Sequence, residues 1–413
     1  MSDETRLAGR IRAEIDAGGP MTFERFMELV LYDPLDGYYA TRADRPTRQG
    51  DFLTAPELHP IFGHVLSRQL GEMWERLGRP AGFTVREYGA GAGTLMLTVM
   101  AGLAVDGSPL HHVLRYEPVE ASPRGLAELV ERWAAAGLAD RIVTDGPAGL
   151  GPRGELPASG GSGRLTGVVI ANEFLDALPV HRVARRGAEL LELYVVAADS
   201  GADALRGAGT ERGAAGDAGG FAWQEGPPST PALAERLASV GVELADGQEA
   251  EVCLGLDHWT SEVADLLVRG FVIVLDYGHP AAELYRSTRR RGTVMAYRDH
   301  VAYDDPLAEP GRRDVTAHVD FTTVAGGLEA GGLSVLGLTS QAEFLLGAGL
   351  EELFAARRGD PATDLAAYFE LRGSILRLLD PRALGGFRVL VAGRGVAVEP
   401  TLRGLSRVRS SLS

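Results

Sequence analysis

The 413-residue sequence contains no lysine and only one cysteine, Cys253. All 41 basic residues are therefore arginine, which excludes a catalytic lysine, a Schiff base and a phosphate-binding loop of the Walker type. A single cysteine cannot form a disulfide within the chain. No set of cysteine and histidine residues has the spacing of a zinc site, so we expect no bound metal.

Long apolar runs and an excess of basic charge are also missing. No apolar run approaches the roughly 20 residues that span a bilayer, and the charged N-terminus does not resemble a secretory signal. The formal net charge of −15 argues against a nucleic-acid partner, because phosphate binding depends on a basic surface. These features predict a cytoplasmic protein with no membrane span, and they leave the oligomeric state open.

The sequence does contain an alternation of short apolar strands and amphipathic helices. We predict strands at 83–87, 113–116, 141–144, 167–171, 271–275 and 387–391, and helices at 3–17, 23–32, 57–78, 94–103, 123–136 and 258–269. Strands that alternate with helices are typical of an α/β fold with a parallel sheet covered on both faces. The predicted parts are an N-terminal helical cap (1–80), an α/β core (81–300), a mainly helical substrate-side region (301–380) and C-terminal strands that rejoin the core sheet (381–413).

The predicted strand at 167–171 ends in a cluster of polar side chains. Asn172, Glu173 and Asp176 follow the apolar run within five positions, and the apolar Phe174 and Leu175 separate the two acids. Ligands of open α/β sheets bind at the carboxyl ends of the strands. The cluster therefore indicates a site rather than a solvated helix face.

A glycine-rich loop follows the first strand of the predicted core. Gly89, Gly91 and Gly93 come directly before a predicted helix, and Glu87 precedes them. Glycines allow positive φ and close approach of the backbone to a ligand, although such a loop alone is equally typical of a plain turn. The GxGxG spacing differs from the GxGxxG of dinucleotide folds.

A nucleoside cofactor bound at such a loop also requires an acid after the second strand, which accepts hydrogen bonds from the ribose hydroxyls. Glu117 and Glu120 both qualify, and the sequence does not distinguish them. Since the loop, this acid and the polar cluster occur in the right order, we predict a nucleoside-cofactor site.

Several segments resemble the MidA-like class I S-adenosylmethionine-dependent methyltransferases. The long motifs are Gly-Asp-Phe-Leu-Thr-Ala-Pro-Glu at 50–57 and Asn-Glu-Phe-Leu-Asp-Ala-Leu-Pro at 172–179. Shorter matches lie at 19–23, 32–39, the glycine loop, 276–278, 314–321 and 344–347, in family order. The sequence departs from the family at Tyr88, where leucine is usual, and at Ala92, where a bulkier polar residue is common.

The resemblance implies a Rossmann-like class I methyltransferase core and S-adenosyl-L-methionine as cofactor. It also implies methylation of a protein arginine, because the family includes a mitochondrial assembly factor that methylates an arginine of a respiratory complex. A protein substrate, such as a respiratory or assembly partner, is the partner that the resemblance suggests.

The polar cluster fits methyl transfer to a guanidinium. A carboxylate binds this planar cation bidentately and localises its charge, so Glu173 and Asp176 are candidate catalytic residues. Asn172 is a third candidate, which would position the acceptor nitrogen or the amino-acid end of the cofactor. The structural alternatives are that Asp176 caps a turn and that Glu173 pairs with an arginine.

Other polar residues have both a functional and a structural interpretation. Asp51, Thr54 and Glu57 would close over the cofactor, but Thr54 and Glu57 also match a capping box. His318, Asp320 and Asp276 are candidates for the substrate side. A lone histidine near a helix start is commonly structural, and Asp276 followed by Gly278 also fits a turn.

Three functions remain open at this level. The leading one is methylation of a protein side chain, an arginine guanidinium. The others are methylation of a small-molecule oxygen or nitrogen, and an assembly factor that binds the cofactor without essential turnover. Hydride transfer with NAD ranks below these because the third glycine of its fingerprint is missing.

Overall fold

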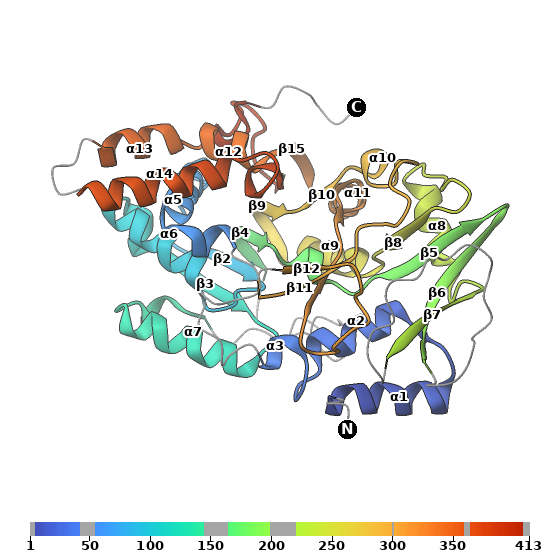
Figure 1. Cartoon of the computed structure of the whole chain (residues 1–413). Helices are drawn as coiled ribbons and strands as arrows, with labels where there is room; N and C mark the ends of the chain where they lie inside the picture. Colours follow the sequence, from blue (N-terminus) through green and yellow to red (C-terminus); the bar gives the residue numbers. More distant parts are fainter. Residues whose placement is uncertain are drawn as a thin grey trace.

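The computed structural model describes residues 5–41, 54–143, 164–198, 220–299, 301–358 and 364–407. Its centre is a six-stranded sheet in the order β15-β16-β9-β4-β2-β3 (Figure 1). The strands are β2 (Phe83–Tyr88), β3 (Leu114–Val119), β4 (Leu165–Asn172), β9 (Leu267–Asp276), β15 (Ser334–Ser340) and β16 (Arg388–Arg394). β3, β2, β4 and β9 are parallel, whereas β16 is antiparallel to both of its neighbours. The predicted α/β class with a largely parallel core is confirmed.

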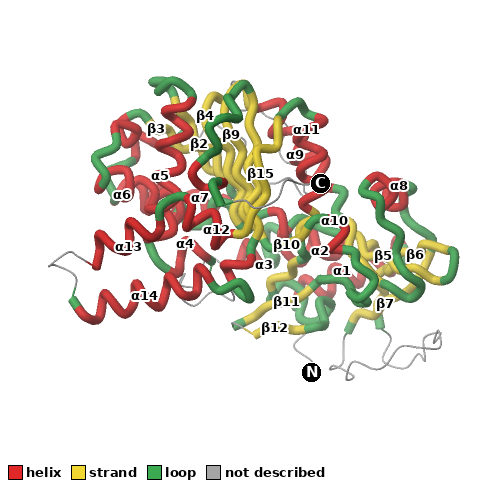
Figure 2. The backbone as a smooth tube through the Cα atoms, turned by 90° about the horizontal axis from the view of Figure 1, so that it is seen from above, coloured by secondary structure: helices red, strands yellow, loops and turns green. Residues whose placement is uncertain are grey.

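Helices cover both faces of this sheet, because its central strands are apolar on both sides (Figure 2). Val168 and Ile170 of β4 face the cluster formed with α5 (Ile61–Arg76) and α6 (Thr94–Val105). Val169 and Ala171 face α9 (Gly255–Leu266) and α11 (Phe321–Ala330). The helices α7 (Pro123–Ala135), α12 (Gln341–Gly347), α13 (Leu350–Arg358) and α14 (Leu365–Leu379) complete the core.

Two sequence predictions about strands are wrong or incomplete. Residues 334–340 lie in the region predicted to be mainly helical, yet they form β15, the edge strand of the main sheet. A short apolar run between two helices carries no periodic signal that separates strand from helix. At 141–144 only Ile142 forms a bridge, to Tyr116, and Thr144 lies outside the described residues.

A second, antiparallel sheet, which the strand pattern did not predict, is formed mainly by strands inserted between β4 and β9. It consists of β1 (Met21–Thr22), β5 (His181–Arg186), β6 (Glu189–Ala197), β7 (Phe221–Gly226) and β8 (Glu249–Val252), and α8 (Ala232–Ser239) packs on β8. The N-terminal helices α1 (Arg6–Gly18) and α2 (Phe23–Tyr32) pack against β6. The first two helices of the cap are therefore anchored on this insertion, whereas α5 covers the main sheet.

Short elements connect the cap and the insertion to the core. They are α3 (Tyr38–Thr41), α4 (Ala55–Leu58), α10 (Ala281–Leu284), the pair β10 (Gly278–His279) and β14 (Val319–Asp320), and a three-stranded sheet of β11 (Met295–Arg298), β12 (Val301–Tyr303) and β13 (Asp314–Thr316). No helix among the described residues is both long and apolar enough to span a bilayer.

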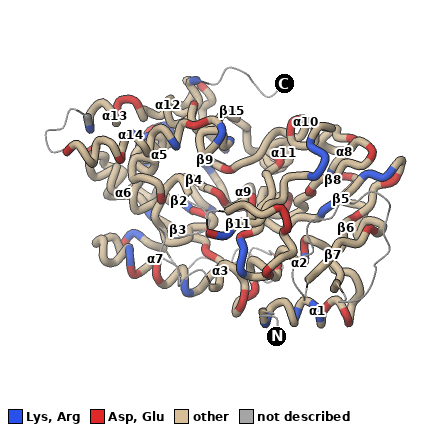
Figure 3. Tube along the Cα trace, in the orientation of Figure 1, with Lys and Arg blue, Asp and Glu red and all other residues tan. Residues whose placement is uncertain are grey.

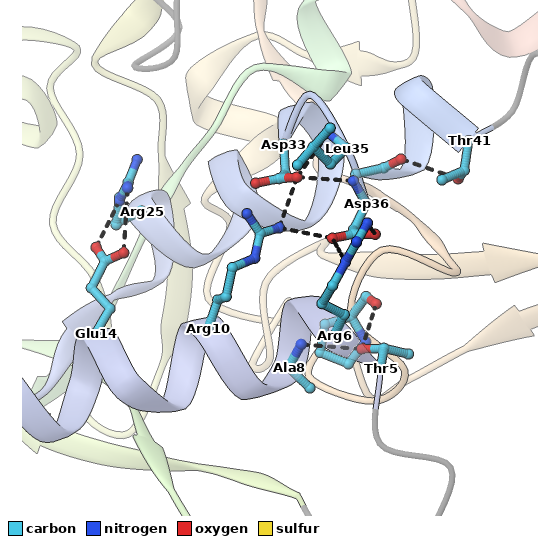
Figure 4. A network of polar contacts seen from close by, with 12 residues as sticks. Thr5, Arg6, Ala8, Arg10, Glu14, Arg25, Asp33, Leu35, Asp36 and Thr41 are labelled. Atoms are coloured by element: carbon cyan, nitrogen blue, oxygen red, sulfur yellow. Dashed lines mark hydrogen bonds and ion pairs between the residues drawn. The ribbon is translucent and has the colours of Figure 1, made fainter.

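Ion pairs hold the turn between α2 and α3 against α1 (Figure 4). Arg6 Nη2 lies 2.6 Å from Asp36 Oδ1, and Arg10 Nη2 lies 2.8 Å from Asp33 Oδ1. Asp33 is buried and also accepts hydrogen bonds from the backbone N–H groups of Leu35 and Asp36. Exposed pairs of this kind add little stability, but here they fix the path of a segment whose tyrosines reach the site described below.

Candidate active site

One cavity of about 260 Å³ opens at the carboxyl ends of β2, β3, β4 and β9. Its wall combines the glycine loop, the segment after β3, the polar cluster after β4, and residues from the N-terminal cap and β13. Its lining side chains include Thr54, Glu57, Glu87, Glu120, Asn172, Glu173, Asp176, Tyr277 and Asp314. The parallel strands thus bring together groups that are far apart in the sequence.

The three glycines of the loop all have positive φ, but only two of them face the cavity. Gly89 (φ +69°) and Gly91 (φ +51°) line it, and a Cβ on Gly91 would meet no described atom within 4 Å. Gly93 (φ +70°) precedes α6, and a Cβ there would lie 2.8 Å from Leu129 Cγ of α7. Gly93 is therefore required for packing, and so is Gly89, whose Cβ would lie 3.0 Å from Phe174 Cδ2, whereas Gly91 brings bare backbone to open space in the cavity.

The structure separates the two candidate acids after β3. Glu120 lines the cavity and accepts hydrogen bonds from the N–H groups of Gly91 (2.8 Å) and Ser122 (3.0 Å). Glu117 is buried and pairs with Arg86, whose Nη2 lies 2.5 Å from Glu117 Oε1. Glu117 does not line the cavity.

Glu87 lies in the cavity wall, at the end of β2. It is buried, and the hydroxyl of Tyr116 donates to its Oε2 at 2.6 Å. Burial raises the pKa of Glu87 to about 8. This carboxyl is therefore largely protonated at neutral pH.

The backbone of the polar cluster turns sharply at Glu173, a non-glycine residue with φ +50°. Such a conformation is uncommon and is often found at functional sites. Glu173 Oε1 accepts hydrogen bonds from the Ala55 N–H (3.2 Å) and from Asn172 Nδ2 (3.4 Å). Burial raises the pKa of Glu173 to about 8. Among the described residues no arginine pairs with Glu173, contrary to the structural alternative considered for it.

Asp176 is the most buried member of the cluster, with 6% of its surface exposed. The Tyr277 hydroxyl donates to its Oδ2, while its Oδ1 is buried and accepts no hydrogen bond from the described residues. Burial, and to a lesser degree the charge of Asp314, raises the pKa of Asp176 to about 7. Burial makes the charged form of this carboxyl costly, and a cation in the cavity would offset that cost.

Asp276 does not belong to the substrate side, which corrects the sequence-based hypothesis. It is fully buried, does not line the cavity, and its Oδ2 accepts from the N–H groups of Phe174 (3.2 Å), Leu175 (2.9 Å) and Asp176 (3.3 Å). A carboxylate at the end of β9 thus holds the loop of the neighbouring strand in place. The turn that Asp276 stabilises carries Glu173 and Asp176.

We expect Asp276→Ala to destabilise the protein by about 3 kcal/mol, the upper end of the cost of leaving buried donors unsatisfied. Asp276→Asn, which keeps one acceptor oxygen, should cost less. The measurement is urea unfolding, with the exposed Asp140→Asn as control. Unchanged unfolding midpoints together with lost activity would show instead that Asp276 acts on the substrate.

His318 and Asp320 also lie away from the cavity, so their assignment to the substrate side is wrong. Asp320 caps α11, accepting from the N–H groups of Thr322 (2.9 Å) and Thr323 (3.3 Å). His318 packs against the rings of Tyr277 and His279, and burial lowers its pKa to about 4. Both positions stabilise the chain that follows β13, as a helix cap and a packed aromatic ring.

Thr54 and Glu57 line the cavity, as the cofactor hypothesis requires. Thr54 precedes α4, but its side chain makes no capping hydrogen bond, so the capping-box alternative is not formed. Asp51 lies outside the described residues.

Sequence reasoning missed the aromatic and acidic wall opposite the glycine loop. Tyr32, Tyr39, Tyr277, Tyr297 and Asp314 line this part of the cavity. They come from the cap, the end of β9, β11 and β13, so no local pattern unites them. The only available signal was that the matching segments at 32–39, 276–278 and 314–321 contain four of the five.

Comparison with known proteins assigns the family. The chain matches the family of S-adenosyl-L-methionine-dependent methyltransferases over residues 65–339. The chain belongs to this MidA-like methyltransferase family. It is also similar to a superfamily member from Burkholderia thailandensis crystallised with S-adenosyl-homocysteine, at 32% identity and a TM-score of 0.80. That comparison covers 97% of this chain and 94% of the other.

Membership makes this protein an S-adenosylmethionine-dependent methyltransferase, and S-adenosylmethionine is its cofactor. The residues of the cavity fit this cofactor. The same cavity is lined by the bare backbone of the glycine loop, by an acid after β3, and by further acids and tyrosines. The alternative of hydride transfer with NAD is thereby excluded. The predicted methyltransferase core is confirmed.

Relatives with curated names are protein arginine methyltransferases. The chain is 27% identical to "Protein arginine methyltransferase NDUFAF7 homolog, mitochondrial" of Drosophila melanogaster, covering 94% of this chain and 85% of that protein. It is 28% identical to the Homo sapiens protein arginine methyltransferase NDUFAF7, covering 84% and 74%. Both proteins are named mitochondrial, which contradicts the cytoplasmic location predicted from the sequence. That prediction is wrong, because a charged N-terminus and the absence of apolar runs do not discriminate between compartments inside a cell.

Proposed function

We propose that this methyltransferase transfers its methyl group to the guanidinium of an arginine in a protein substrate. The observation that carries the proposal is the pair of acids on the loop after β4, Glu173 and the buried Asp176, which line the cavity with no arginine among its described lining residues. A guanidinium supplies the N–H donors and the positive charge that this pair of acids lacks. The names of the curated relatives support the same acceptor.

The residues that would hold the cofactor lie on the glycine-loop side of the cavity. Glu120 would accept the ribose hydroxyls, and the backbone at Gly89 and Gly91 would approach the cofactor closely. Glu87, Thr54 and Glu57 line the same space and would complete its polar wall. These assignments are proposals that rest on position in the cavity.

The acidic loop after β4 would bind and deprotonate the acceptor. S-adenosylmethionine, when bound, supplies a methyl group on a positively charged sulfur, and transfer forms an N–CH3 bond while the S–C electron pair stays on sulfur. Asp176 would orient the acceptor by accepting an N–H at its carboxylate, and it would take up the proton that the methylated nitrogen loses. Tyr277 donates to one oxygen of Asp176 and so fixes the direction of the side chain. Glu173 and Asn172, on the same loop, would position the second edge of the guanidinium.

The test is transfer of an isotope-labelled methyl group, followed by mass spectrometry of the products. Purified protein would be incubated with labelled S-adenosylmethionine and an extract depleted of endogenous cofactor. We expect label on arginine residues of a small number of proteins, a respiratory or assembly protein among them. Label on small molecules alone would replace the proposal by the small-molecule alternative, and label on another protein side chain would change the acceptor.

The rate of arginine methylation should rise with pH between about 6 and 8. The pKa values of Asp176 and Glu173 are raised to about 7 and about 8, so both carboxyls gain charge over this interval. A guanidinium stays protonated throughout, hence only the enzyme's carboxyls change state. We expect kcat/KM to increase up to about tenfold per unit below pH 7 and to level off above pH 8. A flat profile, with stability unchanged over the same range, would contradict the role of these carboxyls.

A further inference from the structure

A second buried acid lies beside Asp176 in the cavity wall. Asp314 begins β13, is 8% exposed and lines the same cavity. The backbone holds the two segments together, since the Ala317 N–H donates to the Asp176 carbonyl at 3.0 Å. Asp314 also contributes to the raised pKa of Asp176, after burial, so the two charges interact. The two acids are 138 positions apart in sequence, but they line one cavity and the charge of one affects the pKa of the other.

Tyrosines surround this pair of acids. The hydroxyl of Tyr39 donates to Asp314 Oδ1 at 3.3 Å, as that of Tyr277 donates to Asp176 Oδ2. Tyr32 packs against Tyr39, with ring centroids 5.4 Å apart, and its hydroxyl is tied to the Ala177 carbonyl at 2.9 Å. Tyrosine faces attract cations, and tyrosine rings lose little entropy on ordering. The acids are therefore held by phenols from two different parts of the chain.

The charge of the lining is one-sided. Seven carboxylate side chains and no arginine or histidine belong to the described residues around the cavity: Glu57, Glu87, Glu120, Glu128, Glu173, Asp176 and Asp314. Elsewhere acidic and arginine segments lie close together along the chain (Figure 3). Burial raises the pKa of several of these acids, and a cation between them would favour their charged forms. The cavity is consequently built for a positively charged occupant on the tyrosine side as well as for the cationic cofactor.

We propose that Asp314 is a specificity-determining residue that, together with Asp176, forms a two-carboxylate site selecting a guanidinium over an ammonium as the methyl acceptor. A guanidinium presents five N–H donors in a fixed plane and can serve two carboxylates at once. A lysine ammonium is a compact, strongly hydrated charge with three donors, and it loses more hydration in a site of this kind. This inference rests on the proposed arginine methylation for the reaction, but it makes a separate statement about binding.

The test measures acceptor binding in the absence of turnover. Calorimetry in saturating S-adenosyl-homocysteine would compare Nα-acetyl-arginine amide with Nα-acetyl-lysine amide, on the wild type and on Asp314→Asn. We expect the wild type to prefer the arginine probe by tenfold or more, and Asp314→Asn to lose roughly 10- to 100-fold in affinity for it, as for a charged hydrogen bond. S-adenosyl-homocysteine should bind the variant as it binds the wild type, which also shows that the variant is folded. Asp304→Asn, at an exposed acid directly after β12, is the matched control.

Each outcome decides the inference. Equal affinity of the wild type and Asp314→Asn for the arginine probe overturns it, as does equal affinity of the wild type for the two probes. If Asp314→Asn does not fold, Asp314→Ser gives the same comparison, and Asp314→Glu should retain the preference for arginine. Binding that depends on Asp314, without labelled arginine in the methyl-transfer experiment, supports the inference and refutes the proposed function. Arginine methylation by Asp314→Asn with the wild-type KM would support the proposed function and refute the inference.

Discussion

Asp176→Asn should lower kcat/KM for arginine methylation by roughly 10²- to 10⁴-fold, the range that a positioned general base contributes. The variant keeps the size of the side chain and an oxygen for the Tyr277 hydroxyl. With that oxygen bound to Tyr277, the other carboxylate oxygen is replaced by an NH2 group. This group donates instead of accepting, so it repels the N–H groups of a guanidinium. Because the buried side chain keeps its size and its contact with Tyr277, the variant tests the loss of the charge with the packing retained.

The measurement needs two readouts on the same preparation. Methyl transfer to an arginine peptide reports catalysis, and the Kd of S-adenosyl-homocysteine reports the cofactor side. We expect the Kd to change by less than about twofold, since Asp176 would touch the acceptor rather than the cofactor. The exposed Asp140→Asn is the control for an isosteric loss of charge. A wild-type rate of methyl transfer by Asp176→Asn would show that Asp176 does not act on the acceptor. A loss of affinity for S-adenosyl-homocysteine would show that Asp176 contacts the cofactor instead.

Glu120→Gln should affect cofactor binding and Glu117→Gln should affect stability, although the two acids are only three positions apart. Glu120→Gln should weaken S-adenosyl-homocysteine by roughly 10- to 100-fold, because a charged acceptor facing the cavity becomes neutral. Glu117→Gln should leave that affinity unchanged. It should instead destabilise the fold by about 3 kcal/mol, because Arg86, which is 2% exposed, loses the anion with which it pairs.

Binding calorimetry and urea unfolding on both variants separate these roles. Because each variant serves as the control for the other, a general effect of losing a negative charge cancels. A Glu117→Gln protein that is stable but binds the cofactor weakly would reverse the assignment of the ribose acceptor. A Glu120→Gln protein with wild-type affinity would leave the ribose without the acceptor proposed for it.

The local parts of the fold could be predicted because they depend on short-range patterns. The strand before the glycine loop was predicted at 83–87 and is observed as β2 (Phe83–Tyr88). The helix at 123–136 is observed as α7 (Pro123–Ala135). Their apolar spacing is set by the two faces that each element buries. The strand at 334–340 and the inserted sheet escaped prediction because strand pairing depends on partners distant in sequence.

The candidate site was predictable only where it follows one stretch of chain. Glu173 and Asp176 were visible because a strand end and two acids are adjacent in sequence, and the structure places both in the cavity wall. Asp276 also ends a strand, and its sequence context is equally suggestive. Its carboxylate points instead toward the backbone of the neighbouring loop and accepts hydrogen bonds from three N–H groups there.

The sequence by itself determined the methyltransferase class, the glycine loop and the acids at the end of β4, because each is a local pattern with a local physical cause. Only the tertiary structure decided that Glu120 rather than Glu117 faces the cavity, and that His318 and Asp320 do not. It also decided that Asp314 and the tyrosines of the N-terminal cap meet Asp176. The physical reason is that a side chain's partner, and therefore its charge and role, is set by segments that the chain brings together over hundreds of residues.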